Sequence, residues 1–227
     1  MNITILSGFG QEPKTFENVF NNNTISLDYL QFYNFEDLIT RDLKVYDNEV
    51  VIGWSLGGQV AVRLIDKGIL KPKFLILVAT PFQYIQNEIN KIGIENHNFD
   101  SFKNVLRFDA LEGLNFLADL SGTGDENKDD VILNMTNNNK TNVNLINWFD
   151  ELKFSCFNIN FKNFPKTIYI CGDSDAVIDC SQYKYFQERI EYFELKVIKN
   201  CGHAPHFSHK NEFLEIINDK YELLEKI

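Results

Sequence analysis

The hexapeptide Gly53-Trp54-Ser55-Leu56-Gly57-Gly58 carries the most specific chemistry in the sequence. It stands between an apolar run at 50–52 and a helical pattern at 56–68, which is the context of a G-x-S-x-G nucleophile elbow. Glycines on both sides of the serine are needed because a Cβ there would collide with neighbouring backbone. We expect Ser55 to be a nucleophile at the carboxyl edge of a sheet, with the N–H of Leu56 as a first oxyanion donor.

A serine nucleophile needs a general base, and His203 is the histidine best placed to act as one. It follows the last apolar run, 195–198, directly after Gly202, so it can overhang the same sheet edge as Ser55. The other histidines have more ordinary expected roles: His206 and His209 pack or cap a helix beginning near 210, and His97 lies on a polar surface.

The third member of a triad orients the imidazole and stabilises its protonated form. Three carboxylates follow the apolar run at 167–171, and they are Asp173, Asp175 and Asp179. Asp175 is favoured, because the first carboxylate after a strand commonly caps the turn, whereas one three residues past Gly172 can reach the histidine loop. The order Ser55, Asp175, His203 is that of an α/β-hydrolase.

The loop 7–11, Ser-Gly-Phe-Gly-Gln, follows the first apolar run and predicts a second oxyanion donor, the N–H of Phe9. Neither a G-x-G-x-x-G nor a P-loop occurs, and no His, Cys and carboxylate cluster has metal-ligand spacing. We therefore expect no cofactor and no metal.

Six short apolar runs predict strands, and helical patterns alternate with them. The predicted strands are 3–6, 27–33, 50–52, 74–78, 167–171 and 195–198, and the predicted helices are 36–44, 56–68, 181–192 and 211–224. This alternation predicts an α/β fold: a mainly parallel sheet of about six strands covered by helices on both faces.

The segment 82–163 interrupts the alternation, because it contains no convincing strand. Its best helical pieces are 101–120 and 145–154, and its clearest loops are 122–128 and 137–140. A structureless loop of this length is improbable in a compact domain. The prediction is a core domain of residues 1–81 and 164–227, with a helical lid, 82–163, inserted between the fourth and fifth strands.

Composition and charge limit the classes of partner that the sequence predicts. The 227 residues carry a formal charge of −10, which argues against nucleic acid or an anionic membrane as the main partner. No apolar run is long enough to span a membrane, and the first residues lack the pattern of a signal peptide. We expect a cytoplasmic monomer with four reduced cysteines.

Taken together, these motifs resemble the α/β-hydrolase superfamily, and more narrowly the pimeloyl-acyl-carrier-protein methyl ester esterases of biotin synthesis. The resemblance covers nearly the whole chain. It rests on the elbow 53–58, on His203-Ala204-Pro205 with Ser208-His209 and Phe213, and on Phe116-Leu117-Ala118-Asp119-Leu120.

The resemblance implies a serine carboxylesterase that hydrolyses the methyl ester of pimeloyl-acyl-carrier protein. It implies that the substrate contacts Phe9, Ser55, Leu56, His203 and the lid residues Phe116, Leu117, Ala118, Asp119 and Leu120. The sequence departs from the family at the oxyanion loop, where Ser7-Gly8-Phe9 replaces the usual His-Gly-Trp. We also expect the superfamily's first two strands to be missing from the sheet.

The expected partner raises a separate difficulty, because docking an acidic carrier protein on a chain of charge −10 requires a local basic patch. The candidates in the lid are scattered: Lys91, Lys103, Arg107, Lys128 and Lys140. Two alternatives therefore stay open. One is a general short-acyl carboxylesterase or thioesterase acting on small esters, and the other is a non-catalytic binding module of the same fold.

Overall fold

The computed structural model of the chain describes residues 2–16, 19–20, 24–43 and 50–224. Six strands form one sheet in the order β2-β1-β3-β4-β5-β6, and every neighbouring pair is parallel. The strands are β1 (Ile3–Leu6), β2 (Thr24–Ser26), β3 (Val50–Trp54), β4 (Phe74–Val78), β5 (Lys166–Gly172) and β6 (Phe193–Ile198). The predicted six-stranded α/β fold is confirmed, and among these strands the sheet is entirely parallel.

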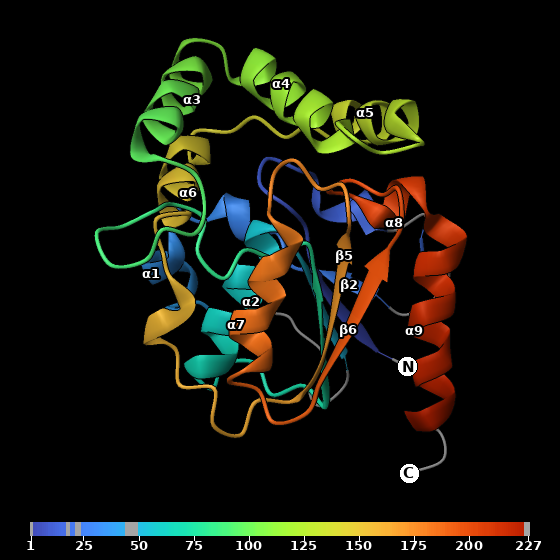
Figure 1. Ribbon diagram of the computed structural model, residues 1–227. Coiled ribbons are helices and arrows are strands. Elements are labelled where there is room, and N and C mark those ends of the chain that lie inside the picture. Colours follow the sequence, from blue (N-terminus) through green and yellow to red (C-terminus); the bar gives the residue numbers. More distant parts are fainter. Residues whose placement is uncertain (1, 17–18, 21–23, 44–49, 225–227) are drawn as a thin grey trace.

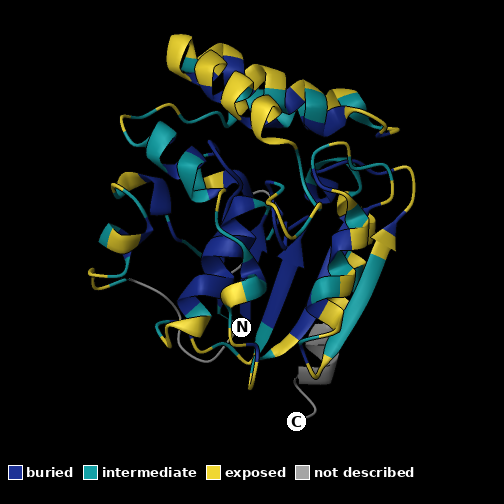
Figure 2. Cartoon of the chain, turned by 60° about the vertical axis from the view of Figure 1, so that its left-hand side comes forward, coloured by how far each residue is buried: buried dark blue, intermediate teal, exposed yellow. Residues whose placement is uncertain are grey.

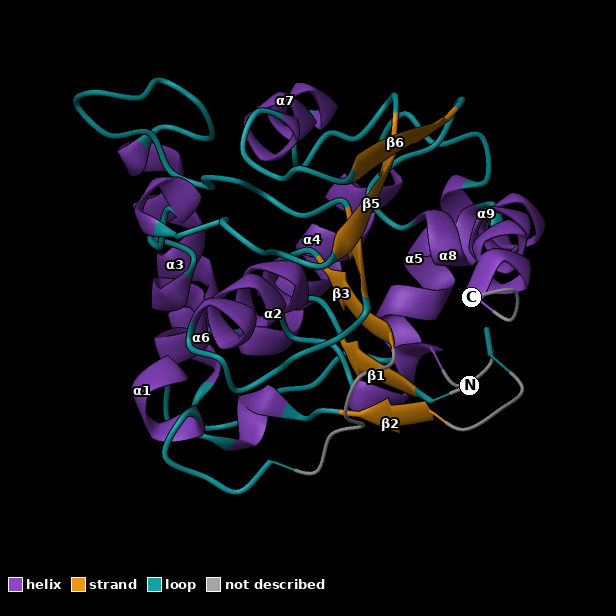
Figure 3. Cartoon of the chain, turned by 90° about the horizontal axis from the view of Figure 1, so that it is seen from below, coloured by secondary structure: helices purple, strands orange, loops and turns teal. Residues whose placement is uncertain are grey.

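The central strands are apolar throughout because both faces of the sheet are covered. Successive residues of β4 point to opposite sides, so Leu75 and Leu77 join one core cluster while Ile76 and Val78 join the other. Figure 3 shows α2 and α7 on one side of the sheet and α8 and α9 on the other. The helices of this core are α1 (Phe35–Leu38), α2 (Leu56–Asp66), α7 (Tyr183–Gln187), α8 (Pro205–Ser208) and α9 (Lys210–Leu224).

Four further helices lie between β4 and β5, and they are α3 (Asn96–Phe108), α4 (Ala110–Gly122), α5 (Lys128–Asn137) and α6 (Leu145–Glu151). In Figure 1, α3, α4 and α5 form a layer across the end of the sheet toward which the strands run. Figure 2 shows that this layer carries exposed residues on its outer side, whereas the central strands beneath are buried. The helical layer therefore covers the sheet edge where the predicted triad lies.

Several predicted boundaries are wrong. The predicted helix 101–120 is two helices, because Asp109 ends α3 and caps α4 by accepting a hydrogen bond from the N–H of Glu112 (3.0 Å). Helix α5 was not predicted. Helix α1 ends at Leu38 rather than near 44, and residue 44 lies outside the described residues.

The predicted strand 27–33 is also wrong, since β2 ends at Ser26 and Tyr29–Gln31 form a short 3-10 helix. The apolar alternation there reflects burial of Tyr29 and Leu30 against the core, where the Tyr29 hydroxyl donates to the Ser7 carbonyl (2.9 Å). The other 3-10 helices are Pro13–Phe16, Cys156–Asn158 and Cys180–Gln182, and the last of these shortens the predicted helix 181–192.

The cysteines do not all remain thiols. Cys171 at the end of β5 and Cys180 form a disulfide, with a Cα–Cα distance of 5.8 Å, so the expectation of four reduced cysteines is wrong. The intervening residues fold back to the strand end, and this return brings together two cysteines that are nine positions apart. Cys156 and Cys201 are free and buried. Within the described residues, no helix is both long and apolar enough to cross a membrane.

Candidate active site

Ser55 occupies a strained turn between β3 and α2. Its backbone has φ 55° and ψ −123°, a conformation that L-residues other than glycine rarely adopt. Only glycine fits at Gly57, because a Cβ there would collide with the carbonyl oxygens of Leu6 and Ser7. The hydroxyl of Ser55 is thereby held at the carboxyl edge of the sheet, as the sequence predicts.

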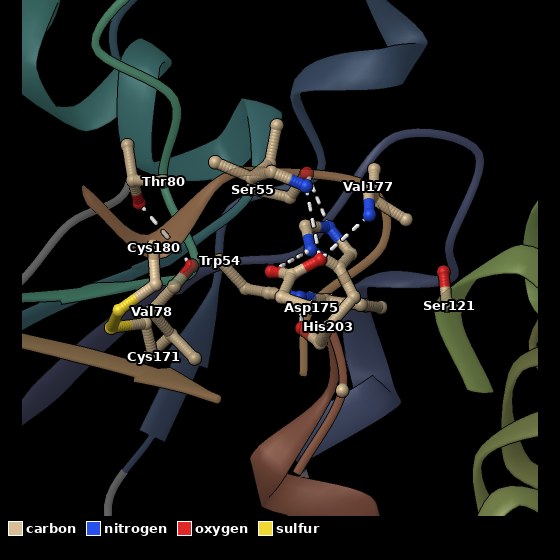
Figure 4. Close-up of polar contacts among 12 residues, drawn as sticks. Trp54, Ser55, Val78, Thr80, Ser121, Cys171, Asp175, Val177, Cys180 and His203 are labelled. Carbon is tan, nitrogen blue, oxygen red and sulfur yellow. Dashed lines mark hydrogen bonds and ion pairs between the residues drawn. A yellow bond between two sulfur atoms is a disulfide. The ribbon is translucent and has the colours of Figure 1, made fainter. Parts of the chain in front are cut away.

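His203 bridges the other two residues of the predicted triad. Its Nε2 lies 3.0 Å from the Ser55 Oγ and its Nδ1 lies 2.8 Å from the Asp175 Oδ2 (Figure 4). The other oxygen of Asp175 accepts hydrogen bonds from the N–H groups of Val177 (2.8 Å) and Ile178 (2.9 Å). The side chains of His203 and Asp175 are only 3% and 1% exposed, so water does not compete for these contacts.

The alternatives weighed from the sequence lie elsewhere. Asp173 pairs with Lys199 (3.3 Å), and Asp179 caps the 3-10 helix after it by accepting from the Ser181 N–H (2.8 Å). His97 is exposed beside Glu95, at 3.1 Å. Of the three carboxylates and four histidines considered, the structure brings only Asp175 and His203 to Ser55.

The backbone of the histidine loop is also held in place. The indole N–H of Trp54 donates to the His203 carbonyl (2.9 Å), and the His203 N–H donates to the Ser121 carbonyl of α4 (3.0 Å). Figure 4 draws Trp54 and Ser121 around this loop. Trp54 of the elbow and Ser121 of the helical layer thus contact the backbone of His203 from different sides.

A small, mostly apolar cavity of about 20 Å³ adjoins Ser55 and His203. Gly8 and Phe9 form part of its wall, which is where a second oxyanion donor would have to lie. Leu56 begins α2 beside Ser55 and is fully buried. Further lining residues, which the sequence did not single out, are Tyr84, Phe102, Met135, Phe149, Leu152 and Val177.

Tyr84 is the polar member of that missed set. Burial, with a smaller contribution from the Asp175 charge, raises its pKa to about 12, so the phenol stays protonated at neutral pH. It also lines a second, larger groove of about 550 Å³ that runs between α3, α4 and the loop after β5. No sequence motif marks Tyr84, and its place depends on how the residues after β4 turn back over the sheet.

The segment 116–120, which the sequence predicts to contact the acyl chain, lies in α4, so its residues point to different sides of that helix. Leu117 lines both the cavity at Ser55 and the groove, and Phe116 and Leu120 line the groove. Ala118 is fully buried in a core cluster, and Asp119 pairs with Lys128 at the surface (2.9 Å). Helix α4 therefore turns Ala118 and Asp119 away from both spaces.

The profile of the alpha/beta hydrolase family matches residues 6–216, which includes the elbow, the aspartate loop and the histidine loop. The chain belongs to the alpha/beta hydrolase family. Among solved structures, an esterase from Exiguobacterium antarcticum has a TM-score of 0.78 at 16% identity, covering 98% of this chain and 92% of its own. A bromoperoxidase from Bacillus anthracis has a TM-score of 0.76 at 19% identity, covering 95% and 90%. At these identities the likeness shows the fold alone.

Curated relatives of this hydrolase chain carry a narrower name. A pimeloyl-[acyl-carrier protein] methyl ester esterase from Nitrosospira multiformis is 26% identical over 195 residues, which are 79% of this chain and 71% of the relative. A biotin biosynthesis bifunctional protein from Teredinibacter turnerae is 26% identical over 187 residues. Those residues are 75% of this chain but only 32% of that relative, so the chain spans about a third of its length.

Proposed function

We propose that this alpha/beta hydrolase is a serine carboxylesterase that uses Ser55, His203 and Asp175 as its catalytic triad. The observation that carries the proposal is the imidazole of His203, which contacts the Ser55 hydroxyl on one side and the Asp175 carboxylate on the other. A buried His with both nitrogens engaged in this way, beside an apolar cavity, has the geometry of general-base catalysis.

In this mechanism His203 takes the proton of Ser55 as Oγ attacks the ester carbonyl carbon. Asp175 holds the imidazole and stabilises the imidazolium, and the N–H groups of Leu56 and Phe9 stabilise the oxyanion. Removal of one such donor typically costs about 2.7–4 kcal/mol of barrier. His203 then protonates the departing methoxide oxygen, and water hydrolyses the acyl-enzyme by the same route.

The proposed substrate is the methyl ester of pimeloyl-acyl-carrier protein. It is supported by the names of the curated relatives and by a mostly apolar groove beside the catalytic cavity, since both spaces are lined by Tyr84, Phe102, Leu117 and Val177. In the proposal the segment 82–163 is the lid over this groove, and its residues Phe116, Leu117 and Leu120 contact the acyl chain. We further propose that the enzyme is a cytoplasmic monomer.

The decisive experiment for the triad is hydrolysis of p-nitrophenyl butyrate by Ser55→Ala. We expect turnover to fall by roughly a thousandfold or more, because the nucleophile is lost while the fold is not. Ser181→Ala, which removes a hydroxyl from an exposed serine outside the catalytic cavity, is the matched control and should keep wild-type turnover. Full turnover by Ser55→Ala would contradict the mechanism.

A second candidate function is that of a general short-acyl esterase, and it is favoured by the negative charge of the segment 82–163. Acidic residues outnumber lysines and arginines in 82–163, which is unfavourable for an acidic carrier. The two candidates are separated by comparing kcat/KM for the carrier-bound pimeloyl methyl ester with that for the same ester on free pantetheine. A preference for the carrier of at least roughly tenfold supports the proposed substrate. Equal values, together with failure to rescue a biotin auxotroph that lacks its methyl esterase, support the general esterase.

A further inference from the structure

We infer that Asp125, in the turn between α4 and α5, is a positioning residue that sets the loop carrying His203. The inference rests on the proposed function, since it concerns the placement of the proposed general base. Asp125 belongs to the helical segment 82–163, which lies between β4 and β5, and it is far in sequence from the triad. It is nevertheless buried, with 8% of its surface exposed, and its side chain contacts Gly202, the residue before His203.

Both oxygens of the Asp125 carboxylate accept hydrogen bonds. Oδ2 accepts hydrogen bonds from the Gly202 N–H (2.7 Å) and from the Ser208 hydroxyl (2.8 Å). Oδ1 accepts from the N–H of Asn127 (2.8 Å), which fixes the carboxylate within its own turn. One charged group therefore ties together the two ends of the segment from Gly202 to Ser208, which contains His203.

Neighbouring contacts extend this connection in both directions. The N–H of Glu126 donates to the Asn200 carbonyl (2.9 Å), and the Glu126 carboxylate lies 3.2 Å from the His209 Nε2. The Asn127 amide donates to the Ser208 carbonyl (3.1 Å). Ser208 and His209, which the catalytic proposal leaves without a role, thus contact the helical segment rather than the substrate cavity.

The fit between the turn and the catalytic loops is tight. A Cβ at Gly202 would lie 2.5 Å from the Ser121 carbonyl oxygen. A Cβ at Gly124, whose φ is +82°, would lie 2.8 Å from the carbonyl oxygen of Ser174, the residue before Asp175. The turn consequently contacts both the histidine loop and the aspartate loop, and the relative position of the two loops depends on it.

Part of the same cluster has the residue types of a metal site. Asp125, Cys201 and His209 each present a ligand atom, and these atoms lie within 4.8 Å of one another. Burial raises the pKa of the Cys201 thiol, which disfavours the thiolate that a metal requires. Because the Asp125 oxygens already accept three hydrogen bonds, the positioning role accounts for the cluster without an ion.

Loss of the carboxylate would leave the Gly202 N–H buried without an acceptor, and the loop would shift to satisfy it. A displacement of about 1 Å in a catalytic group can cost on the order of a hundredfold in rate. The imidazole would also move relative to Asp175. Its protonated form would then be less stabilised, and the pKa seen in the acid limb of kcat/KM would fall.

The test compares Asp125→Asn and Asp125→Ala with the wild type in p-nitrophenyl butyrate hydrolysis across pH. Asn is isosteric, but its amide presents an NH₂ to the N–H of either Gly202 or Asn127, so it loses at least one of these bonds. We expect kcat to fall at least tenfold with KM changed less than threefold, and the acid-limb pKa to fall. Asp129→Asn, at an exposed acidic residue of the same segment, should leave all three unchanged.

A second readout does not depend on turnover. The His203 Nδ1 proton, hydrogen-bonded to Asp175, should give a far-downfield proton resonance in the wild type that His203→Ala lacks, and Asp125→Asn should shift or broaden it. If Asp125→Ala does not fold, Asp125→Asn and Ser208→Ala decide the matter. A folded Asp125→Asn with wild-type kcat, acid limb and resonance overturns the inference. An inactive wild type with the resonance present overturns the proposed function instead.

Discussion

His206 is a buried histidine in an apolar setting, three positions after His203. It stacks on Phe16 at 4.2 Å between ring centroids and lies edge-on to Trp54 at 4.5 Å. Within the described part of the chain, neither of its ring nitrogens has a hydrogen-bond partner. Burial, reinforced by nearby His203, lowers the pKa of His206 well below its ordinary value of 6.5. The packing role expected for this residue therefore requires the neutral imidazole.

The buried imidazole makes stability depend on pH. Below about pH 6.5 the unfolded chain protonates His206 while the native protein does not, so the unfolded state binds more protons. We expect the free energy of unfolding attributable to this residue to be fully present above pH 6.5. It should be lost as pH falls, by up to about 1.4 kcal/mol per pH unit. Urea unfolding between pH 7.5 and 5 measures the slope.

The matched variants for this prediction are His206→Phe and His97→Gln. His206→Phe should flatten the pH dependence without loss of stability at pH 7.5, because an aromatic ring without unpartnered nitrogens fits the same stack. His97 is exposed, and its replacement should leave the slope as in the wild type. An unchanged slope in His206→Phe would show that other groups cause the acid sensitivity.

Asp175 and Asp173 provide a second comparison between single residues. Asp175→Asn should lower kcat by roughly 10³–10⁴, because an amide cannot hold the reactive tautomer of His203 or stabilise its charge. Asp173→Asn alters contacts with exposed Lys199 and with the Ser174 hydroxyl, neither of which lines the catalytic cavity, and should leave kcat unchanged. Steady-state kinetics at neutral pH distinguishes the two variants. If kcat fell in Asp173→Asn but not in Asp175→Asn, Asp173 would be the carboxylate of the triad.

The meeting of Ser55, Asp175 and His203 could be predicted from the sequence because each residue follows a strand, and parallel strands end at one edge of a sheet. Most of the residues that line the cavity beside Ser55 could not be predicted from the sequence. Tyr84 and Phe149 reach the cavity through the course of the chain between β4 and β5, and that course leaves no periodic signal. In α4, the sequence match covered Phe116 to Leu120 evenly, but the helical rotation keeps only part of that segment at the groove.

At the scale of elements, the loop after β5 is closed by the Cys171–Cys180 disulfide and carries Asp175 within it. Closing a loop of this size reduces the conformational entropy of the unfolded chain and is worth about 2–3 kcal/mol. We expect Cys180→Ser to lower the melting temperature by several degrees. Dithiothreitol should have the same effect on the wild type but none on the variant.

Thiol titration of the denatured, unreduced protein checks the same prediction chemically. Two free thiols are expected, from Cys156 and Cys201. Four free thiols, with a melting temperature that dithiothreitol does not change, would show that the bond is absent from the protein in solution. The sequence did not predict the pairing, because the two cysteines become neighbours only through the folded loop.

The break between α3 and α4 shows what local sequence does encode. Residues 101–120 are helix-compatible throughout, yet Asp109 stops the helix by acting as an N-cap, with Glu112 at the third helical position. Asp109→Ala should therefore destabilise the protein by about 1 kcal/mol, measured by chemical unfolding. Asp100→Ala, on the exposed face within α3, should change stability much less.

The whole molecule carries a net charge of −10, which would repel an acidic carrier protein. Binding of such a carrier would therefore depend on a small number of exposed lysine and arginine side chains. Three of the five candidate lid cations pair with carboxylates: Lys103 with Asp150, Lys128 with Asp119 and Lys140 with Asp28. Among the described residues, Lys91 and Arg107 are exposed and have no ion-pair partner. Both lie in the helical segment, so an acidic partner approaching the lid would meet them there.

If the carrier is the substrate, Arg107→Glu and Lys91→Glu should raise its KM several-fold and weaken its dependence on salt. Hydrolysis of p-nitrophenyl butyrate should not change. Lys71→Glu, at an exposed lysine between α2 and β4 and outside the lid, is the charge-matched control. Carrier kinetics insensitive to both lid variants would favour small esters as the substrates.

The hydrogen bond from the His203 N–H to the Ser121 carbonyl has a consequence for protein engineering. Because α4 supplies an acceptor to the backbone of the proposed base, the helical segment is not an interchangeable cap. A chimera that carries a relative's helical segment on this core would have to place a backbone carbonyl where Ser121 has its own. Otherwise the chimera would fold with His203 out of position. Library designs that seek new acyl specificity should diversify the groove face of α3 and the first turns of α4, and keep the end of α4 intact.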